Sequence, residues 1–172
     1  MQPSARRVAA PARYVIRDFT DADSAEVNVT ALAAFSDFKD AIDDWPTMAE
    51  RVGHMSDLVA HAELVVATVD GRVAGAVGYC GPGRPKQEWF DVAWPCVRML
   101  VVHPSYRGLG IGRALTEECV RRARRDGASL IALHTSAIMK TALDMYRRMG
   151  FELHREQPLR HGVPYAVYIK RL

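Results

Sequence analysis

Hydrophobic residues fall in short runs along the chain, and the spacing of these runs predicts alternating strands and helices. The clearest signal is a pair of valine-rich runs at 63–69 and 72–80, separated by Asp70 and Gly71. Asp-Gly readily adopts the positive φ angles of a tight turn. We therefore predict a β-hairpin over residues 63–80.

The other apolar runs complete a mixed α/β pattern. Asp21 is a typical helix N-cap, and Gly127 and Gly150 are typical helix ends. Predicted helices span 21–35, 47–61, a segment from residue 112 to 125, and 140–149. Predicted strands span 13–17, 63–69, 72–80, 96–102, 129–135, 151–155 and 164–169, the last two joined by a turn at 161–162. The order β-α-α-β-β-β-α-β-α-β-β predicts one α/β domain with a mixed sheet.

Composition supports a single globular domain. Of the 172 residues, 49% are apolar and 25% are charged, which suits one sizeable core. We expect residues 1–12 to form a disordered tail and residues 13–172 to form the domain. The apolar runs are too short to span a bilayer, and the three cysteines lie far apart without a metal-ligand pattern. These features favour a reduced, cytoplasmic protein with no metal and no membrane contact.

The chemistry-bearing feature is a glycine-rich segment, 107–113, between a predicted strand and a predicted helix. Backbone N–H groups at a helix start are unpaired and electropositive, and glycines allow a phosphate to approach them. Arg107 and Arg113 could add charge. A Walker loop is excluded because Arg113 stands where that motif has lysine, and a dinucleotide fold would have its glycines after the first strand. Taken alone, the segment also fits a turn without a ligand.

A second segment makes the pattern specific. Arg107, Gly110 and Gly112 have the Arg-x-x-Gly-x-Gly spacing of the acyl-CoA pyrophosphate motif in the GNAT superfamily of N-acetyltransferases. Residues 142–151 resemble the second motif of that family, which has a tyrosine followed by Gly-Phe at a helix end. The two motifs also have the separation that is usual in the family. The chain thus resembles a GNAT acetyltransferase, most strongly over residues 63–151.

The resemblance implies a site for acetyl-CoA as co-substrate. The strand before the glycine turn would separate from the next strand and pair with the pantetheine arm. Tyr146 would be the general acid that protonates the departing thiolate, because its reference pKa lies near that of a thiol. The residues that the resemblance assigns to cofactor binding are Leu100, Val101, Val102, Arg107, Gly108, Leu109, Gly110, Ile111, Gly112 and Arg113. The alternative for Tyr146 is simple packing beside Phe151.

The chain departs from the family pattern at two places. Many members have an asparagine seven residues before the tyrosine, where this chain has Met139; Ser136 or Thr135 could supply the lost contact. Members that use a carboxylate base often carry it on the strand before the cradle, where this chain has arginine and methionine. The remaining candidate bases are His134, Glu88, Asp91 and Glu63, each of which also fits a structural or solvated role.

We expect direct transfer of acetyl from acetyl-CoA to an amine, since neither motif contains a cysteine. The acceptor is expected to be a small molecule; a protein N-terminus or lysine, and a regulatory CoA-binding domain without turnover, stay open. A pocket closed by the aromatic loop around Trp89 and Trp94 would favour small molecules. Self-association into a homodimer is also left open.

Charge is distributed unevenly along the chain. Residues 18–63 contain eleven acidic and two basic residues, whereas residues 98–172 contain fourteen basic and six acidic ones. The acidic part includes Asp37, Asp40, Asp43 and Asp44, close to Trp45. We expect this cluster either to attract a cationic amine or simply to be solvated. The four arginines Arg121, Arg122, Arg124 and Arg125 fit a solvated helix end, and nucleic-acid binding is not expected.

Overall fold

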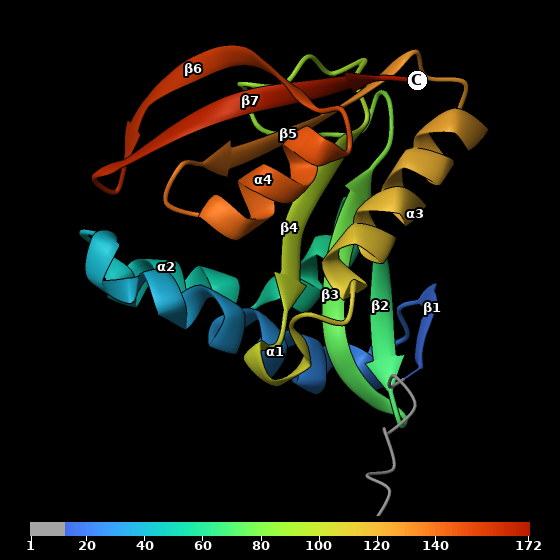
Figure 1. Ribbon diagram of the computed structural model, residues 1–172, viewed down its shortest axis with the longest axis vertical. Coiled ribbons are helices and arrows are strands. Elements are labelled where there is room, and N and C mark those ends of the chain that lie inside the picture. The colour runs from blue at the N-terminus through green and yellow to red at the C-terminus, as the bar shows by residue number, and fades with distance from the viewer. Residues whose placement is uncertain (1–12) are drawn as a thin grey trace, which may run out of the picture.

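A computed structural model describes residues 13–172 of the chain. It contains a seven-stranded mixed sheet in the order β1-β2-β3-β4-β5-β7-β6, with helices on both faces (Figure 1). The predicted element order and α/β class are confirmed. The tail predicted at 1–12 lies outside the described residues. The elements are β1 Tyr14–Asp18, α1 Ser24–Phe35, α2 Trp45–Val52, β2 Glu63–Val69, β3 Arg72–Cys80, β4 Cys96–Val102, α3 Ile111–Arg125, β5 Leu130–Ser136, α4 Lys140–Arg148, β6 Glu152–Arg160 and β7 Val163–Arg171.

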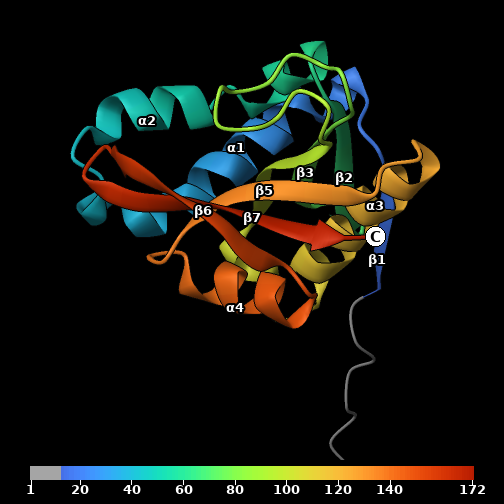
Figure 2. The same cartoon turned by 90° about the horizontal axis from the view of Figure 1, so that it is seen from above.

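The sheet separates two hydrophobic layers. Helices α1 and α2 cover one face, and α3 and α4 cover the other (Figure 2). Val66 and Val101 face the first layer with Met55, whereas Val65 and Leu115 belong to the second. Alternate residues of a strand point to opposite faces, so β2 and its neighbours supply both layers. No described helix is both long and apolar enough to cross a membrane.

The predicted β2–β3 hairpin is confirmed, with Asp70 at φ 50° and Gly71 at φ 79°. Two other predicted boundaries are wrong. The helix predicted at 47–61 ends as α2 at Val52, because Gly53 stops it and a 3₁₀ turn follows at Met55–Ala60. The helix predicted from Asp21 begins instead with a 3₁₀ turn at Asp21–Asp23, which Thr20 caps through a capping box.

Strand β4 separates from β5 soon after it begins. The two strands are parallel but pair only at Cys96 with Ala132 and at Val97 with Leu133. Beyond this point β4 stays paired with β3, although the register shifts and Met99 adopts a φ of 48°. A bulge of this kind bends a strand and re-aims its side chains. The sheet therefore opens between β4 and β5, next to α4.

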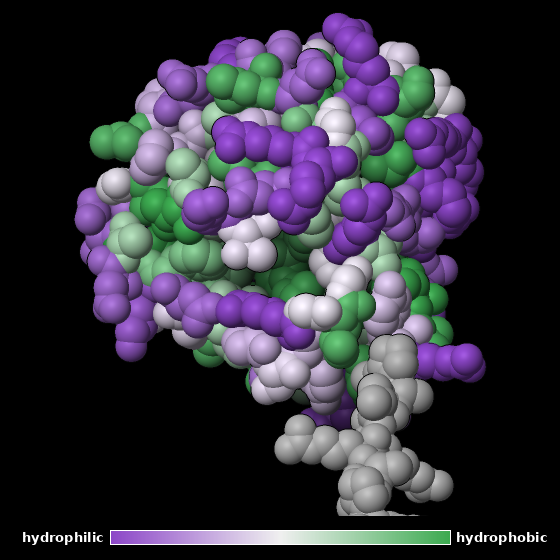
Figure 3. Space-filling view, in the orientation of Figure 1, coloured by the Kyte–Doolittle hydropathy of each residue, from purple (hydrophilic) through white to green (hydrophobic). Residues whose placement is uncertain are grey.

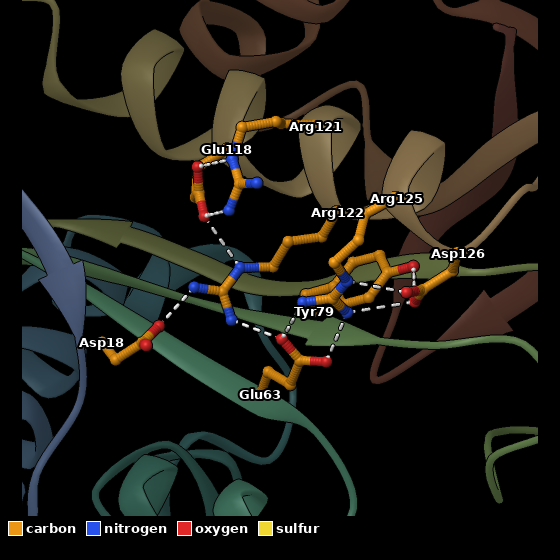
Figure 4. A network of polar contacts seen from close by, with 8 residues as sticks. All are labelled: Asp18, Glu63, Tyr79, Glu118, Arg121, Arg122, Arg125 and Asp126. Carbon is orange, nitrogen blue, oxygen red and sulfur yellow. Dashed lines mark hydrogen bonds and ion pairs between the residues drawn. The ribbon is translucent and has the colours of Figure 1, made fainter.

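The C-terminal end of α3 is tied to two strands, β1 and β2, by ion pairs (Figure 4). The guanidinium of Arg122 contacts Asp18 of β1, Glu63 of β2 and, at 2.9 Å, Glu118 of its own helix. The Arg122 side chain is only 8% exposed. The expectation that Arg122 is solvated is therefore wrong: it lies inside a charge network that fixes α3 on the sheet.

Candidate active site

The glycine-rich segment leads from β4 into α3 through a 3₁₀ turn at Pro104–Tyr106. Gly108 and Gly110 have φ angles of 80° and 83°, which residues other than glycine rarely adopt. Gly110 is the N-cap of α3 and provides no capping side chain, so the first backbone N–H groups of the helix are free to bind an anion. A Cβ built on Gly108 would meet nothing within 4 Å. The segment fits a diphosphate.

The two arginines of this segment are engaged elsewhere. Arg107 contacts Asp37 at 2.5 Å, and Arg113 contacts Glu117 at 2.8 Å. Both pairs are about half exposed, and pairs of this kind contribute little to stability. A bound phosphate would therefore compete for either guanidinium at small cost. The apolar residues assigned to the cradle have a packing role as well, since the Ile111 side chain is buried in the core and Leu109 packs against it.

A cavity of about 750 Å³ begins at the gap between β4 and β5. Figure 3 shows a hollow with a hydrophobic floor over β4, between α4 and α1, with hydrophilic rims. Of the residues assigned to cofactor or catalysis, Leu100 and Tyr146 line it. The side chains of Val101 and Val102 belong to the cores on opposite sides of the sheet. Any contribution of these two valines to cofactor binding would come from their backbone.

Tyr146 lies in α4, with 5% of its surface exposed and its ring 5.7 Å from that of Phe151. Both interpretations of this residue are therefore compatible with its position, because it packs beside Phe151 and also lines the cavity. Burial raises the pKa of its hydroxyl above the ordinary value. The phenol is protonated at neutral pH, as a general acid must be, and burial makes it a weaker acid than a free phenol.

The two residues proposed to replace the missing asparagine differ in position. The Ser136 hydroxyl is buried, accepts a hydrogen bond from the Ile138 N–H at 3.3 Å, and does not line the cavity. Thr135 lines the cavity, and its hydroxyl oxygen lies 3.9 Å from the sulfur of Met139. Of the two, Thr135 is thus the better placed to contact a cofactor.

Two of the four candidate bases line the cavity and two do not. Glu63 is bound by Arg122 and Arg125, and Asp91 accepts a hydrogen bond from the Ala93 N–H, and neither lines the cavity. The other two, Glu88 and His134, do line it.

His134 has an unusual environment. Its ring stacks between Trp89 at 4.6 Å and Tyr165 at 4.7 Å, and its buried Nε2 has no hydrogen-bond partner. Burial, with Arg160 and Arg98 nearby, lowers its pKa to about 4. The imidazole is therefore neutral at pH 7, and its ring contributes to the cavity lining while Nε2 stays buried.

The acidic cluster lies outside this cavity. None of Asp37, Asp40, Asp43 and Asp44 lines it. Asp37 is paired with Arg107, and Asp44 caps α2 through the Thr47 N–H at 3.4 Å. Three arginines, Arg51, Arg98 and Arg160, line the cavity instead. Sequence reasoning gave no role to Arg51 or Arg160, and it noted Arg98 only as a departure from the family pattern.

A second hollow, of about 760 Å³, lies beside the ion-pair network. Its charged lining includes Arg122, Arg125, Glu63 and Asp126, which are paired with one another. The hollow does not include Tyr146 or the glycine-rich segment. These observations place the candidate chemistry in the cavity beside β4 and not in this hollow. The described residues also contain no group of three or more metal-binding side chains.

Comparison with known proteins shows the family to which the chain belongs. The model of the acetyltransferase (GNAT) domain matches residues 60–153. S-alkylcysteine N-acetyltransferase of Bacillus subtilis (strain 168) is 28% identical over 146 residues, which cover 83% of this chain and 81% of that protein. "Probable N-acetyltransferase family 8 member 5" of Mus musculus is 33% identical over 102 residues, 56% of this chain, and the match spans only 41% of that relative.

The fold is shared with solved structures. The structure of yncA from Salmonella typhimurium with its cofactor acetyl-CoA superimposes with a TM-score of 0.67 at 18% sequence identity, covering 92% of this chain and 94% of the other. The family match includes β4, the glycine-rich segment and α4. The chain belongs to the GNAT superfamily of acetyl-CoA-dependent N-acetyltransferases.

Proposed function

We propose that this protein transfers acetyl from acetyl-CoA directly to the amine of a small molecule. The carrying observation is one cavity that has Tyr146 on its α4 side and Trp89 from the 81–95 loop among its lining residues. Trp94 of the same loop packs against His154 instead, at 5.1 Å. A cavity bounded by such a loop suits a small acceptor better than a protein surface. The name of the Bacillus relative also refers to a small amine, S-alkylcysteine.

The donor would be held largely by the backbone. The first N–H groups of α3 would bind the diphosphate, and the unpaired edge of β4 beyond Val97 would pair with the amide-rich pantetheine arm. This arrangement would bring the thioester to the cavity, beside Leu100 and Tyr146.

The reaction then needs two proton transfers. The neutral amine attacks the thioester carbonyl, a C–N bond forms, the C–S bond breaks, and the Tyr146 hydroxyl protonates the leaving thiolate. The amine proton would leave through water, relayed by Glu88 or His134, the two predicted bases that line the cavity. All three cysteines lie outside the cavity lining, which favours direct transfer over an acyl-enzyme.

Thiol release from acetyl-CoA would test this proposal. A panel of amines, amino acids, aminoglycosides and peptides should include small molecules that release CoA and become acetylated, as measured by mass spectrometry. A protein that binds acetyl-CoA in calorimetry but acetylates no small amine would refute it. Acetylation of peptides alone would favour the protein-modifying alternative.

A further inference from the structure

Three arginines without an ionic partner converge on the acceptor side of the cavity. Arg51 comes from α2, Arg98 from β4 and Arg160 from the end of β6, and all three line the cavity. Within the described residues, none of them forms an ion pair at 4.0 Å or less. The cavity lining also has two carboxylates, Asp57 and Glu88, and neither is ion-paired. The lining therefore carries an excess of positive charge.

Arg98 is the most unusual of the three. It lies one residue beyond the last β4–β5 pair, at Val97, so its position coincides with the opening of the sheet. Burial lowers the pKa of its guanidinium; the nearby thiol groups of Cys96 and Cys80 oppose this effect, and the positive charge of Arg51 adds to it. An unpaired, half-buried charge is costly, and folded proteins usually pair such groups or keep them for a ligand. Arg98 is therefore suited to receive an anion.

The neighbouring polar groups are also without partners. Arg160 lies over the Trp89 ring at 4.3 Å, and Trp89 stacks on His134. Three buried side-chain atoms in the described part of the chain have no hydrogen-bond partner: Gln87 Oε1, Trp89 Nε1 and His134 Nε2. All three residues line this cavity. Buried polar atoms are usually satisfied, so this concentration of exceptions indicates a place for a polar ligand.

One wall of the cavity is largely apolar. Its apolar side chains come from α1, α2 and the following 3₁₀ turn: Phe35, Met48, Val52, Met55 and Leu58. A fitting acceptor would thus combine an anionic group, an amine and an apolar portion.

We propose that the acceptor is a small amine bearing a carboxylate, with an α-amino acid of apolar side chain as the simplest example. Arg98 binds the carboxylate, assisted by Arg51 or Arg160, while the apolar side chain packs against the methionine-rich wall. The proposal rests on the proposed acetyl transfer and specifies its substrate. It opposes the earlier expectation of a purely cationic acceptor, because the acidic cluster lies outside the cavity and the arginines would repel such a molecule.

Matched amines test the carboxylate directly. We would compare kcat/KM for L-leucine with isoamylamine, L-methionine with 3-(methylthio)propylamine, and phosphoethanolamine with ethanolamine. The amino acids should exceed their decarboxylated partners by at least about tenfold, or ~1.4 kcal/mol. Equal or better activity with the decarboxylated or polyamine substrates would overturn the carboxylate proposal while leaving acetyl transfer intact. A preference confined to the phosphate-bearing amine would also overturn it.

The variant Arg98→Met tests whether Arg98 binds the carboxylate of the acceptor. Arg98→Met keeps the length and apolar packing of the side chain, and should raise KM for the preferred amino acid by at least about tenfold. The same variant should leave kcat/KM for the decarboxylated amine unchanged or increased. Arg171→Met is the matched control, because Arg171 is exposed at the end of β7 and does not line the cavity. Equal effects of the two substitutions, or an equal loss with both kinds of amine, would refute the role of Arg98.

Binding provides a readout that does not depend on turnover. Calorimetry of the amino acid with the protein saturated in CoA should show binding that Arg98→Met weakens, and thermal melting should show that the variant is folded. If CoA binds but neither amino acids nor amines are acetylated or bound, the proposed function fails together with this inference. If amines are acetylated without regard to the carboxylate, only the inference fails.

Discussion

Replacing Tyr146 by phenylalanine separates its chemical role from its packing role. The substitution removes one hydroxyl from a ring that is 5% exposed and keeps the edge-to-face contact with Phe151. The core volume hardly changes, so we expect the free energy of unfolding to stay within about 1 kcal/mol of wild type. Acetyl-CoA affinity should also persist, because the proposed diphosphate contacts come from backbone groups at the start of α3 and not from the Tyr146 hydroxyl.

Turnover should respond very differently. Burial keeps the Tyr146 phenol protonated at neutral pH, and a general acid typically contributes about 10²–10⁴-fold. We expect kcat to fall at least about 10²-fold, which corresponds to ~2.7 kcal/mol in the activation barrier. Single-turnover measurement of CoA release with a saturating acceptor gives the chemical step without interference from product release.

The matched control is Tyr168→Phe. Tyr168 is also buried, at 7% exposure, and belongs to the same core cluster as Tyr146, but it does not line the cavity. Its variant should retain kcat. Equal single-turnover rates for wild type and Tyr146→Phe, with the same acetyl-CoA affinity, would assign Tyr146 to packing and refute the general-acid argument.

Three further predictions follow from the cradle and the ion pairs. Gly112→Val places a branched side chain at the start of α3, against Met145, Val102 and Leu100, and should weaken acetyl-CoA binding at least about tenfold by calorimetry because it narrows the space beside the proposed diphosphate site; unchanged affinity in a folded variant would contradict the cradle. Arg122→Met removes the cation that Asp18, Glu63 and Glu118 share; Asp18 loses its ion pair, whereas Glu63 keeps Arg125 and Glu118 keeps Arg121. The substitution should lower the free energy of unfolding by about 2 kcal/mol and the Tm by roughly 4–8 °C; an unchanged Tm would show that the network is energetically neutral. The network, with Arg121, holds the pKa of Glu118 at about 2, below its unfolded value of about 4.3. The stability it contributes is therefore present above pH 4.3 and lost as the pH falls toward 2; urea melts from pH 7 to pH 2.5 should show this loss, and Glu118→Gln should reduce it.

The features that the sequence predicted well are those determined by neighbouring residues. The Asp70–Gly71 hairpin and the αL glycine after α4, Gly150 at φ 87°, depend on local backbone preference. The glycine-rich segment could be located for the same reason. The end of α2 was missed although Gly53 marks it, because apolar spacing continued through Met55, which packs in the core from a 3₁₀ turn.

The acceptor side depends instead on contacts between distant segments. Arg51 and Arg160 lie 109 positions apart in the chain, and both line the same cavity only because α2 and the β6–β7 turn meet there. The His161 carbonyl accepts a hydrogen bond from the Asp43 N–H at 3.0 Å, which ties these two segments together. Charge counted along the sequence pointed to acidic residues 37–44, whereas charge counted around the cavity points to arginines. No local sequence pattern shows which charged residues will face the cavity.

Donor and acceptor recognition therefore have different physical bases in this protein. The proposed donor site uses backbone groups of the β4 edge and the α3 start, so many different side chains would be compatible with it. The proposed acceptor site uses side chains on several separate elements, chiefly Arg98 and the Trp89–His134–Tyr165 stack. A substitution such as Arg98→Met should consequently alter which amine is acetylated while acetyl-CoA affinity stays unchanged. Specificity for the amine and affinity for the donor should then vary independently, because the residues that determine them do not overlap.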